Sequence, residues 1–335
     1  MTALAQRICP EPAPQPLVRS EGLTKDFARA GGFLGSASRP VRAVHDVSFD
    51  LAPGEIFGVV GESGSGKSTL GRLVLRLLEP TAGNVFFDGQ DLGQLPPADL
   101  RRFRRHMQMI FQDPFASLNA RMTVGEALGE PLRLHRGLSR SEALEEAARL
   151  MERVGLTREQ LSRYPRAFSG GQRQRVAIAR ALASAPRFIV ADEPVSALDV
   201  SIQAEVLNLL QDLQRGLGLS LMFISHDLSV VEAISDRVMV LYLGRVMELA
   251  PTDALYARPA HPYTAALMAA APGSNRRGAR LILAGEIPSP SDPPSGCVFR
   301  TRCPFAVAEC ARVVPPLREI APGHFKACIR DDLAL

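Results

Sequence analysis

The segment Gly61-Glu-Ser-Gly-Ser-Gly66-Lys67-Ser68 gives the strongest indication of how this chain folds. It follows the apolar run Ile56-Phe57-Gly58-Val59-Val60, which is typical of a buried strand, and leucines at helical spacing predict a helix from Ser68 to Leu78. A glycine-rich turn between a strand and a helix binds phosphate, because its backbone N–H groups close around the anion and the helix N-terminus attracts negative charge. The segment therefore predicts an α/β fold with a phosphate-binding loop.

The residues of this loop have separate expected tasks. The phosphate cradle is expected to comprise Gly61, Ser63, Gly64, Ser65 and Gly66. Lys67 is expected to reach the terminal phosphates of the ligand, the Ser68 hydroxyl to bind Mg²⁺, and Thr69 to complete the binding site. The alternative interpretation is a flexible Gly/Ser loop, but a chance match in a chain of this length is on the order of one in a hundred.

A second apolar run, Phe188-Ile-Val-Ala-Asp192-Glu193-Pro194, ends in two carboxylates. Because adjacent strand residues point to opposite sides, one carboxylate can bind Mg²⁺ while the other contacts a water molecule. We assign Asp192 to the Mg²⁺ shell and Glu193 to the general base. A polar turn after a strand would explain this segment equally well on its own, and the phosphate loop favours the catalytic interpretation.

The segment Phe168-Ser169-Gly170-Gly171-Gln172-Arg173 precedes a periodic run from Val176 to Ala183 that predicts a helix. Ser169, Gly170, Gly171 and Gln172 can form a second anion site by the same physics as the first. The simpler alternative is a capped helix start. One phosphate loop already occupies one set of phosphates, so a second such site calls for an explanation.

Together these three motifs resemble the ATP-binding-cassette (ABC) ATPases, over roughly residues 21 to 250. The resemblance implies a P-loop ATPase domain with a helical subdomain at about residues 113–168. It also implies a head-to-tail dimer, in which ATP lies between the phosphate loop of one subunit and the Ser169–Gln172 segment of the other.

Four further positions match the family. Gln112 matches the glutamine that contacts Mg²⁺ and the attacking water, and His226 matches the histidine that contacts the γ-phosphate. Asp199 matches the loop that communicates across the dimer. Phe27 resembles the aromatic that stacks on adenine, with Phe33 as a competitor and a core aromatic as the alternative.

The last 80 residues indicate which group of ABC ATPases this chain resembles. The segments Ala260-His-Pro-Tyr-Thr-Ala-Ala-Leu267 and Gly285-Glu-Ile-Pro-Ser-Pro290, with Arg302-Cys-Pro-Phe305, resemble the C-terminal extension of oligopeptide and dipeptide permease ATPases, of the second-ATPase type. This implies a second homologous ATPase subunit, two membrane-spanning permease subunits and an extracytoplasmic solute-binding protein. The implied location is peripheral, on the cytoplasmic face of the cell membrane.

Four of the five cysteines, Cys297, Cys303, Cys310 and Cys328, lie in the last 39 residues. Their spacing, C-x5-C-x6-C-x17-C, differs from the compact pairs of zinc ribbons and ferredoxins. In the resembling family such cysteines can hold an iron–sulfur cluster, so we expect a [4Fe–4S] cluster, with zinc as the alternative. Four reduced, half-buried thiols are the simplest interpretation.

Length and composition limit the possible domain organisation of the chain. The chain has 335 residues, of which 46% are apolar, enough for one large domain and a smaller appendage. We expect a leader at residues 1–18, a nucleotide-binding domain at 19–255 and a small cysteine-containing extension at 256–335. No segment approaches the roughly 18 apolar residues that span a bilayer. The net charge of +4 decides nothing about partners.

Other functions remain to be weighed against peptide import. An importer of nickel chelates or another small solute has a similar tail, and the cargo depends mainly on the partner subunits. A soluble cassette acting on ribosomes typically carries two cassettes, whereas this chain has one phosphate loop and no repeat. A DNA-repair relative carries a long coiled-coil insertion, and the segment between Gln112 and Ser169 is too short for one. We therefore expect no nucleic-acid partner. The tail argues against an exporter.

Overall fold

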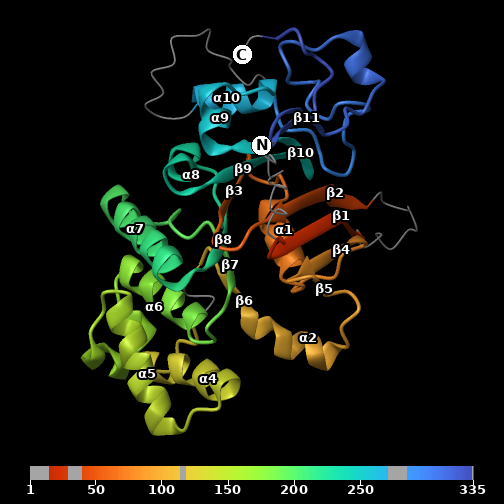
Figure 1. Cartoon of the computed structure of the whole chain (residues 1–335). Coiled ribbons are helices and arrows are strands. Elements are labelled where there is room, and N and C mark those ends of the chain that lie inside the picture. Colours follow the sequence, from red (N-terminus) through yellow and green to blue (C-terminus); the bar gives the residue numbers. More distant parts are fainter. Residues whose placement is uncertain (1–14, 29–39, 114–117, 271–284, 334) are drawn as a thin grey trace, which may run out of the picture.

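The computed structural model describes residues 15–28, 40–113, 118–270, 285–333 and 335 (Figure 1). Most of the expected leader, and Phe33, lie outside the described residues. The last residues of the expected leader are already part of the fold, because Leu17 is buried and Val18 is the first residue of strand β1.

An eight-stranded sheet forms the centre of the molecule, in the order β11-β12-β10-β9-β3-β8-β7-β6. Strands β9, β3, β8, β7 and β6 run parallel to one another, and β10 to β12 are antiparallel. The predicted strands at 56–60 and at the apolar run from Phe188 are confirmed to within one residue. The bounds are β3 Ile56–Val60, β6 Met107–Ile110, β7 Phe188–Asp192, β8 Ser220–Ile224, β9 Arg237–Tyr242, β10 Arg245–Pro251, β11 Arg318–Ala321 and β12 His324–Lys326.

A second, antiparallel sheet has the order β2-β1-β4-β5, with β1 Val18–Phe27, β2 Val41–Leu51, β4 Ala82–Phe87 and β5 Gln90–Asp91. Helix α1 (Lys67–Val74) lies between the two sheets, and its leucines share a core with residues of both. The predicted helix to Leu78 is too long. Arg76 has a φ of 52°, which breaks the helix, and Leu77 is 47% exposed instead of facing the core.

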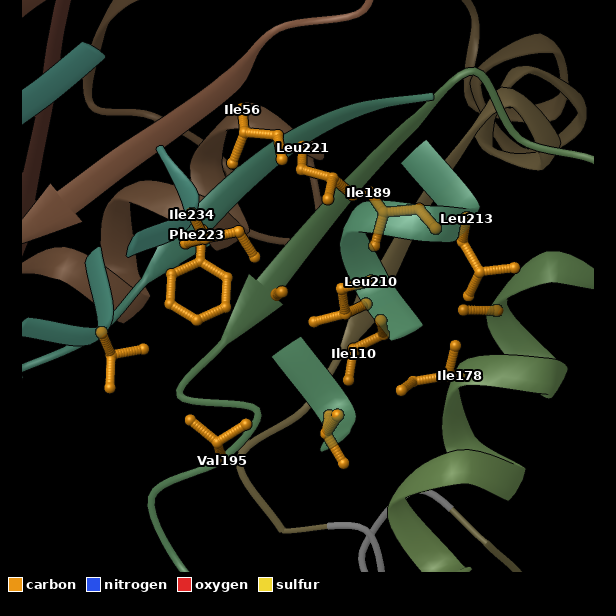
Figure 2. Packing of buried hydrophobic residues seen from close by; sticks show 14 of the residues in the cluster. Ile56, Ile110, Ile178, Ile189, Val195, Leu210, Leu213, Leu221, Phe223 and Ile234 are labelled. Carbon is orange, nitrogen blue, oxygen red and sulfur yellow. The ribbon is translucent and has the colours of Figure 1, made fainter. Parts of the chain in front are cut away.

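Helices on the opposite face of the large sheet form a second core. In Figure 2, Ile178 of α6 (Gly170–Leu182) and Leu210 of α7 (Val200–Leu217) face Ile189 of β7. Helix α8 (Leu228–Ile234) adds Ile234 to the same core. The two cores have separate residues, so α1 and α6 lie on opposite faces of the sheet.

The segment between β6 and α6 is mostly helical. It contains α4 (Val124–Arg136), α5 (Arg140–Arg153) and the short 3-10 turns η2 (Arg158–Ser162) and η3 (Pro165–Ala167). Ser139 and Glu142 form a capping box at the start of α5, and Gly155, after its end, has a left-handed φ of 73°. Helix α2 (Pro97–Phe103) and η1 (Arg104–His106) precede β6. No helix in the described ranges offers an apolar segment long enough for a bilayer.

The C-terminal extension (residues 256–335) is joined to the large sheet. Strand β12 pairs with β10, where Glu248 lies opposite Lys326 and Leu249 opposite Phe325. The extension also contains the end of α9 (Thr252–Ala257), α10 (Pro262–Ala270) and η4 (Ala308–Ala311). Its strands continue the large sheet, so the expected boundary at residue 256 does not separate two independent sheets.

Candidate functional site: a nucleotide site at the ends of parallel strands

Four segments that carry predicted site residues follow adjacent parallel strands of the large sheet. The phosphate loop follows β3, Gln112 follows β6, and His226 follows β8, while Asp192 ends β7 and Glu193 comes next. Parallel strands bring their carboxyl ends to one side of the sheet, where ligands bind in open α/β sheets. The topology therefore gathers residues that are up to 165 positions apart in the chain, from Gly61 to His226.

Close packing around the phosphate loop explains two of its glycines. A Cβ atom on Gly61 would lie 2.2 Å from the carbonyl oxygen of Leu241, and one on Gly66 would lie 2.2 Å from that of Ala43. Gly66 also has a φ of 103°, which side chains rarely tolerate. At the tip, Ser63 and Gly64 are exposed, and a Cβ on Gly64 would meet open space. Ser65 is buried and Thr69 is half-buried.

Lys67 lies inside the loop and is only 5% exposed. Its ammonium donates hydrogen bonds to the carbonyl oxygens of Gly61, at 2.7 Å, and Glu62, at 3.0 Å. Burial lowers the pKa of Lys67, although the nearby carboxylates of Glu193 and Asp192 act in the opposite direction.

Ser68 and Asp192 form the second part of the site. The Ser68 hydroxyl donates a hydrogen bond of 2.7 Å to Asp192 Oδ1, which joins the start of α1 to the end of β7. Asp192 is 2% exposed, and burial raises the pKa of its carboxyl group, opposed by the hydrogen bond from Ser68. A hydroxyl and a carboxylate oxygen in contact are ligands of the kind that Mg²⁺ prefers.

Glu193 is held by contacts on both of its carboxylate oxygens. Gln112 Nε2 donates to Oε2 at 3.0 Å, and His226 Nδ1 lies 3.2 Å from Oε1. The backbone of Glu193 has a φ of 47°, in the left-handed region, and its N–H donates to the carbonyl of Ile224 at 2.9 Å. A non-glycine residue in this conformation costs energy that the surrounding structure has to offset, and such residues cluster at active sites.

The Ser169–Gln172 segment lies on the other face of the sheet from α1, at the start of α6. Ser169 accepts a hydrogen bond from the Gln172 backbone, and the Gln172 side chain accepts one from the Ser169 backbone, so the pair forms a capping box. Gly171 is buried against Ile202, whose Cγ2 atom would lie 2.6 Å from a Cβ. Ser169 and Gly170 are exposed.

Two further predicted residues are also exposed. Asp199 precedes α7, and the neighbouring Leu198 lies 3.5 Å from where a Cβ on Gly170 would be, so the Asp199 and Ser169 segments are neighbours. Phe27 ends β1 with 39% of its surface exposed, and the Lys25 ammonium lies 5.4 Å from its ring centroid. Phe27 is thus partly accessible at the end of its strand.

The four C-terminal cysteines share one small region. Cys297, Cys310 and Cys328 are buried, and Cys303 is half-buried. Burial, together with the other three thiols, raises the pKa of Cys303 to about 11. The Arg330 N–H donates to the Cys328 sulfur at 3.4 Å. Within the described residues, no three His, Cys, Asp or Glu side chains are arranged so that they could hold a metal ion.

One set of contacts at the phosphate loop involves residues without a predicted role. Arg302 donates to both carboxylate oxygens of Glu62, at 2.6 and 3.0 Å, and the Tyr263 hydroxyl accepts the Glu62 N–H at 3.0 Å. Arg302 and Tyr263 both belong to segments that resemble the permease tail. Neither segment carries a signal that would pair it with a residue more than 200 positions away.

The chain matches two known families. The family described as ABC transporter matches residues 44–196, and the one described as oligopeptide/dipeptide transporter, C-terminal region, matches residues 247–310. A putative peptide import ATP-binding protein of Brucella ovis is 58% identical over 320 residues, which cover 95% of this chain and 99% of the relative. The oligopeptide transport ATP-binding protein AppF of Bacillus subtilis is 51% identical over 309 residues, which cover 91% of this chain and 94% of AppF.

Solved structures agree with this assignment. The ATP-binding cassette MJ0796, solved as a dimer in a post-hydrolysis state with ADP and phosphate, is 31% identical to this chain, with a TM-score of 0.63. The match covers 70% of this chain and 98% of that cassette. The protein is thus an ATPase of the ABC transporter family, and it carries the C-terminal region typical of oligopeptide and dipeptide transporters.

Proposed function

We propose that this protein is the ATP-hydrolysing subunit of a membrane importer that carries oligopeptides or dipeptides. The observation that carries the proposal is the contact of Gln112 and His226 with the two oxygens of Glu193, beside the Ser68–Asp192 pair and the phosphate loop. Similarity over nearly the whole length to relatives named as peptide import ATP-binding proteins supports the cargo class.

The residues divide the reaction among them. The loop and Lys67 bind the phosphates of ATP, and Glu193 accepts a proton from the attacking water. Gln112 and His226 orient the Glu193 carboxylate and the water beside it. Ser68, Asp192 and Gln112 would hold Mg²⁺, which neutralises charge on the phosphates when it is bound.

The Ser169–Gln172 segment, in which Ser169 and Gly170 are exposed, acts between subunits in this proposal. It lies on the other face of the sheet from α1, and the start of helix α6 suits the γ-phosphate of ATP on a second, homologous ATPase subunit. Asp199 lies next to this segment, so in the proposed dimer it would lie near the nucleotide site of the second subunit. Phe27 offers its exposed face to the adenine ring.

The remaining partners follow from the cargo. Import requires two membrane-spanning permease subunits, and an extracytoplasmic solute-binding protein would deliver the peptide. The ATPase would then lie on the cytoplasmic face of the membrane, bound to the permeases. An importer for nickel chelates or another small solute would use the same ATPase chemistry with different partners.

Co-purification tests this proposal. The tagged full-length chain would be isolated from native membranes, and ATP hydrolysis measured with and without peptide and binding protein. Recovery of two membrane-spanning proteins, a second ATPase and peptide-stimulated hydrolysis supports peptide import. Recovery of ribosomes or DNA-repair proteins without membrane subunits would contradict the transport role, and stimulation by a nickel chelate alone would contradict the peptide cargo.

We also propose that Cys297, Cys303, Cys310 and Cys328 hold a [4Fe–4S] cluster. The other three thiols lie near enough to contribute to the raised pKa of Cys303, and a backbone N–H donates to the Cys328 sulfur. Four thiols in one region are suitable ligands for such a cluster. Since the described side chains are not arranged as a finished metal site, binding would require the thiols to move closer together. Anaerobically purified protein should contain about four iron and four sulfide per chain, Cys303→Ser should lose both, and the control Cys9→Ser should keep them. Wild-type protein without iron, sulfide or zinc would contradict metal binding.

A further inference from the structure

Glu62, the second residue of the phosphate loop, is held from the C-terminal extension at two places. The Arg302 guanidinium makes a bidentate ion pair with the Glu62 carboxylate, at 2.6 and 3.0 Å. The Arg302 side chain is only 5% exposed. The Tyr263 hydroxyl accepts the backbone N–H of Glu62 at 3.0 Å. Side chain and main chain of one loop residue are thus both fixed by residues outside the nucleotide-binding domain.

The two residues that hold Glu62 are themselves rigidly supported. The Tyr263 ring packs against Tyr242 of β9, with centroids 4.8 Å apart, and against Phe299, at 5.2 Å. Phe299 also packs edge-on against Tyr242 at 5.4 Å. The Arg302 N–H closes a turn onto the Phe299 carbonyl at 3.0 Å. An aromatic cluster and a tight turn therefore restrict the positions that Arg302 and Tyr263 can take.

The contact continues from Glu62 to the residue that is expected to bind phosphate. The Glu62 carbonyl oxygen accepts a hydrogen bond from Lys67 Nζ at 3.0 Å, and another from the Ser65 N–H at 3.1 Å. A displacement of the Glu62 peptide would therefore move both an acceptor of Lys67 and the start of the cradle. Because Lys67 and the cradle are expected to bind the phosphates, their placement should set the affinity for ATP, in which a tenfold change corresponds to about 1.4 kcal/mol.

We propose that Arg302 and Tyr263 are positioning residues for the phosphate loop, so that the affinity for ATP depends on the C-terminal extension. The inference rests on the proposed function only in taking ATP as the ligand of the loop. Neither residue reaches the reacting atoms. The buried guanidinium has Glu62 as its ionic partner, so the two side chains form one unit, and loss of either should disturb the loop.

The test compares single substitutions in the full-length chain. Arg302→Met removes the charge and keeps the volume, Tyr263→Phe removes one hydroxyl group, and Arg300→Met is the matched control. Arg300 lies two residues from Arg302 and donates to Ser295, within the same extension. The dissociation constant of MgATP would be measured by calorimetry, and KM and kcat in the purified complex, with circular dichroism to check folding.

The proposal predicts a change in affinity and little change in turnover. Arg302→Met should weaken MgATP binding and raise KM about tenfold, with kcat at saturating ATP within about twofold of wild type. Tyr263→Phe should raise the dissociation constant of MgATP and KM by a smaller factor. Arg300→Met should leave the dissociation constant and KM unchanged. The double variant Glu62→Gln/Arg302→Met should bind no more weakly than Arg302→Met, because the pair acts as one unit.

Folded Arg302→Met and Tyr263→Phe proteins with wild-type affinity for MgATP would overturn the proposal, and so would an equal loss in Arg300→Met. If Arg302→Met does not fold, Tyr263→Phe decides the question. A wild-type protein that binds MgATP but does not hydrolyse it would contradict the proposed function, while the comparison of affinities would still decide the role of Arg302 and Tyr263.

Discussion

His226 and Glu193 are in contact at the carboxyl ends of two adjacent strands, with His226 Nδ1 3.2 Å from Glu193 Oε1. The second oxygen of the same carboxylate accepts a hydrogen bond from Gln112. The Glu193 side chain is 16% exposed, whereas that of His226 is 57% exposed. The carboxylate is thus oriented by its contacts with Gln112 and His226, as suits a group that must accept a proton from one particular water.

Replacement of Glu193 by glutamine should nearly abolish turnover. The amide keeps the shape of the side chain but cannot accept a proton, so ATP hydrolysis should fall about 10²- to 10⁴-fold. Binding of MgATP should persist, and the variant should accumulate as a closed ATP-bound dimer. Steady-state hydrolysis and size-exclusion chromatography with ATP check both points, and near-normal hydrolysis would show that another group is the base.

Replacement of His226 by alanine should distinguish the orientation of the Glu193 carboxylate from the binding of ATP. The variant loses one contact to Glu193 while Lys67, Ser68 and Asp192 keep theirs, so kcat should fall on the order of 100-fold with a much smaller change in KM for ATP. His135→Ala, on α4 of the helical segment, provides the control. A His226→Ala protein with wild-type kcat would remove His226 from the catalytic set.

Two serines with the same local structure test the task of the Ser169 segment. Ser139 and Ser169 each begin a helix with a capping box, so alanine at either position should lower the free energy of unfolding by about 1 kcal/mol. In the proposed dimer only Ser169 contacts ATP, so Ser169→Ala should also reduce ATP hydrolysis several-fold. Denaturant titration and ATPase assays of both variants give the comparison, and equal activities would speak against a nucleotide contact.

The buried His261 should make stability depend on pH. Burial lowers its pKa from 6.5 to about 4, with Glu248 acting upward and Lys326 downward. Between these values the unfolded chain binds a proton that the folded protein does not, so stability falls as the pH decreases from 6.5 to about 4. The loss attributable to this group is about 3 kcal/mol when complete.

Replacement of His261 by asparagine should flatten that dependence. The asparagine oxygen can accept the Tyr263 N–H that now donates to His261 Nδ1 at 3.0 Å, and it does not titrate. The free energy of unfolding, measured by urea titration at pH 7 and pH 5, should differ less in the variant than in the wild type. His135→Asn should keep the wild-type difference. An unchanged difference in His261→Asn would assign the pH dependence to other groups.

Much of the site follows from local sequence, because its parts lie within short motifs. The continuous apolar runs at 56–60 and 188–191 predict buried parallel strands, and polar residues directly after such strands meet at one side of a sheet. This reasoning places the phosphate loop, Asp192 and Glu193 together. Gln112 and His226 required the family resemblance, since a lone glutamine or histidine after a strand has no distinctive pattern.

Contacts between distant segments could not be predicted in this way. The ion pair of Glu62 with Arg302 joins residues 240 positions apart, and neither residue has a pattern that names its partner. Strand β12 has only three residues, too few for a period to be read. Helix α1 was expected to be longer because leucine spacing continues past Val74, while the backbone turns at Arg76. The partner of Ser169 belongs to another chain in the proposed dimer, so one sequence cannot specify it.

The pairing of β12 with β10 also has a consequence for aggregation. Without the extension, β10 would present a row of unpaired N–H and C=O groups, a template to which strands of other molecules can add. Its Glu248 carboxylate, fully buried and bound to the His261 N–H and to His324, would become an unpaired charge. Strand β11 ends the sheet instead, with four residues that include the charged Arg318 and Glu319. The extension therefore covers the seven-residue edge of β10, which could pair with other molecules, and leaves the four-residue, charged strand β11 at the edge of the sheet.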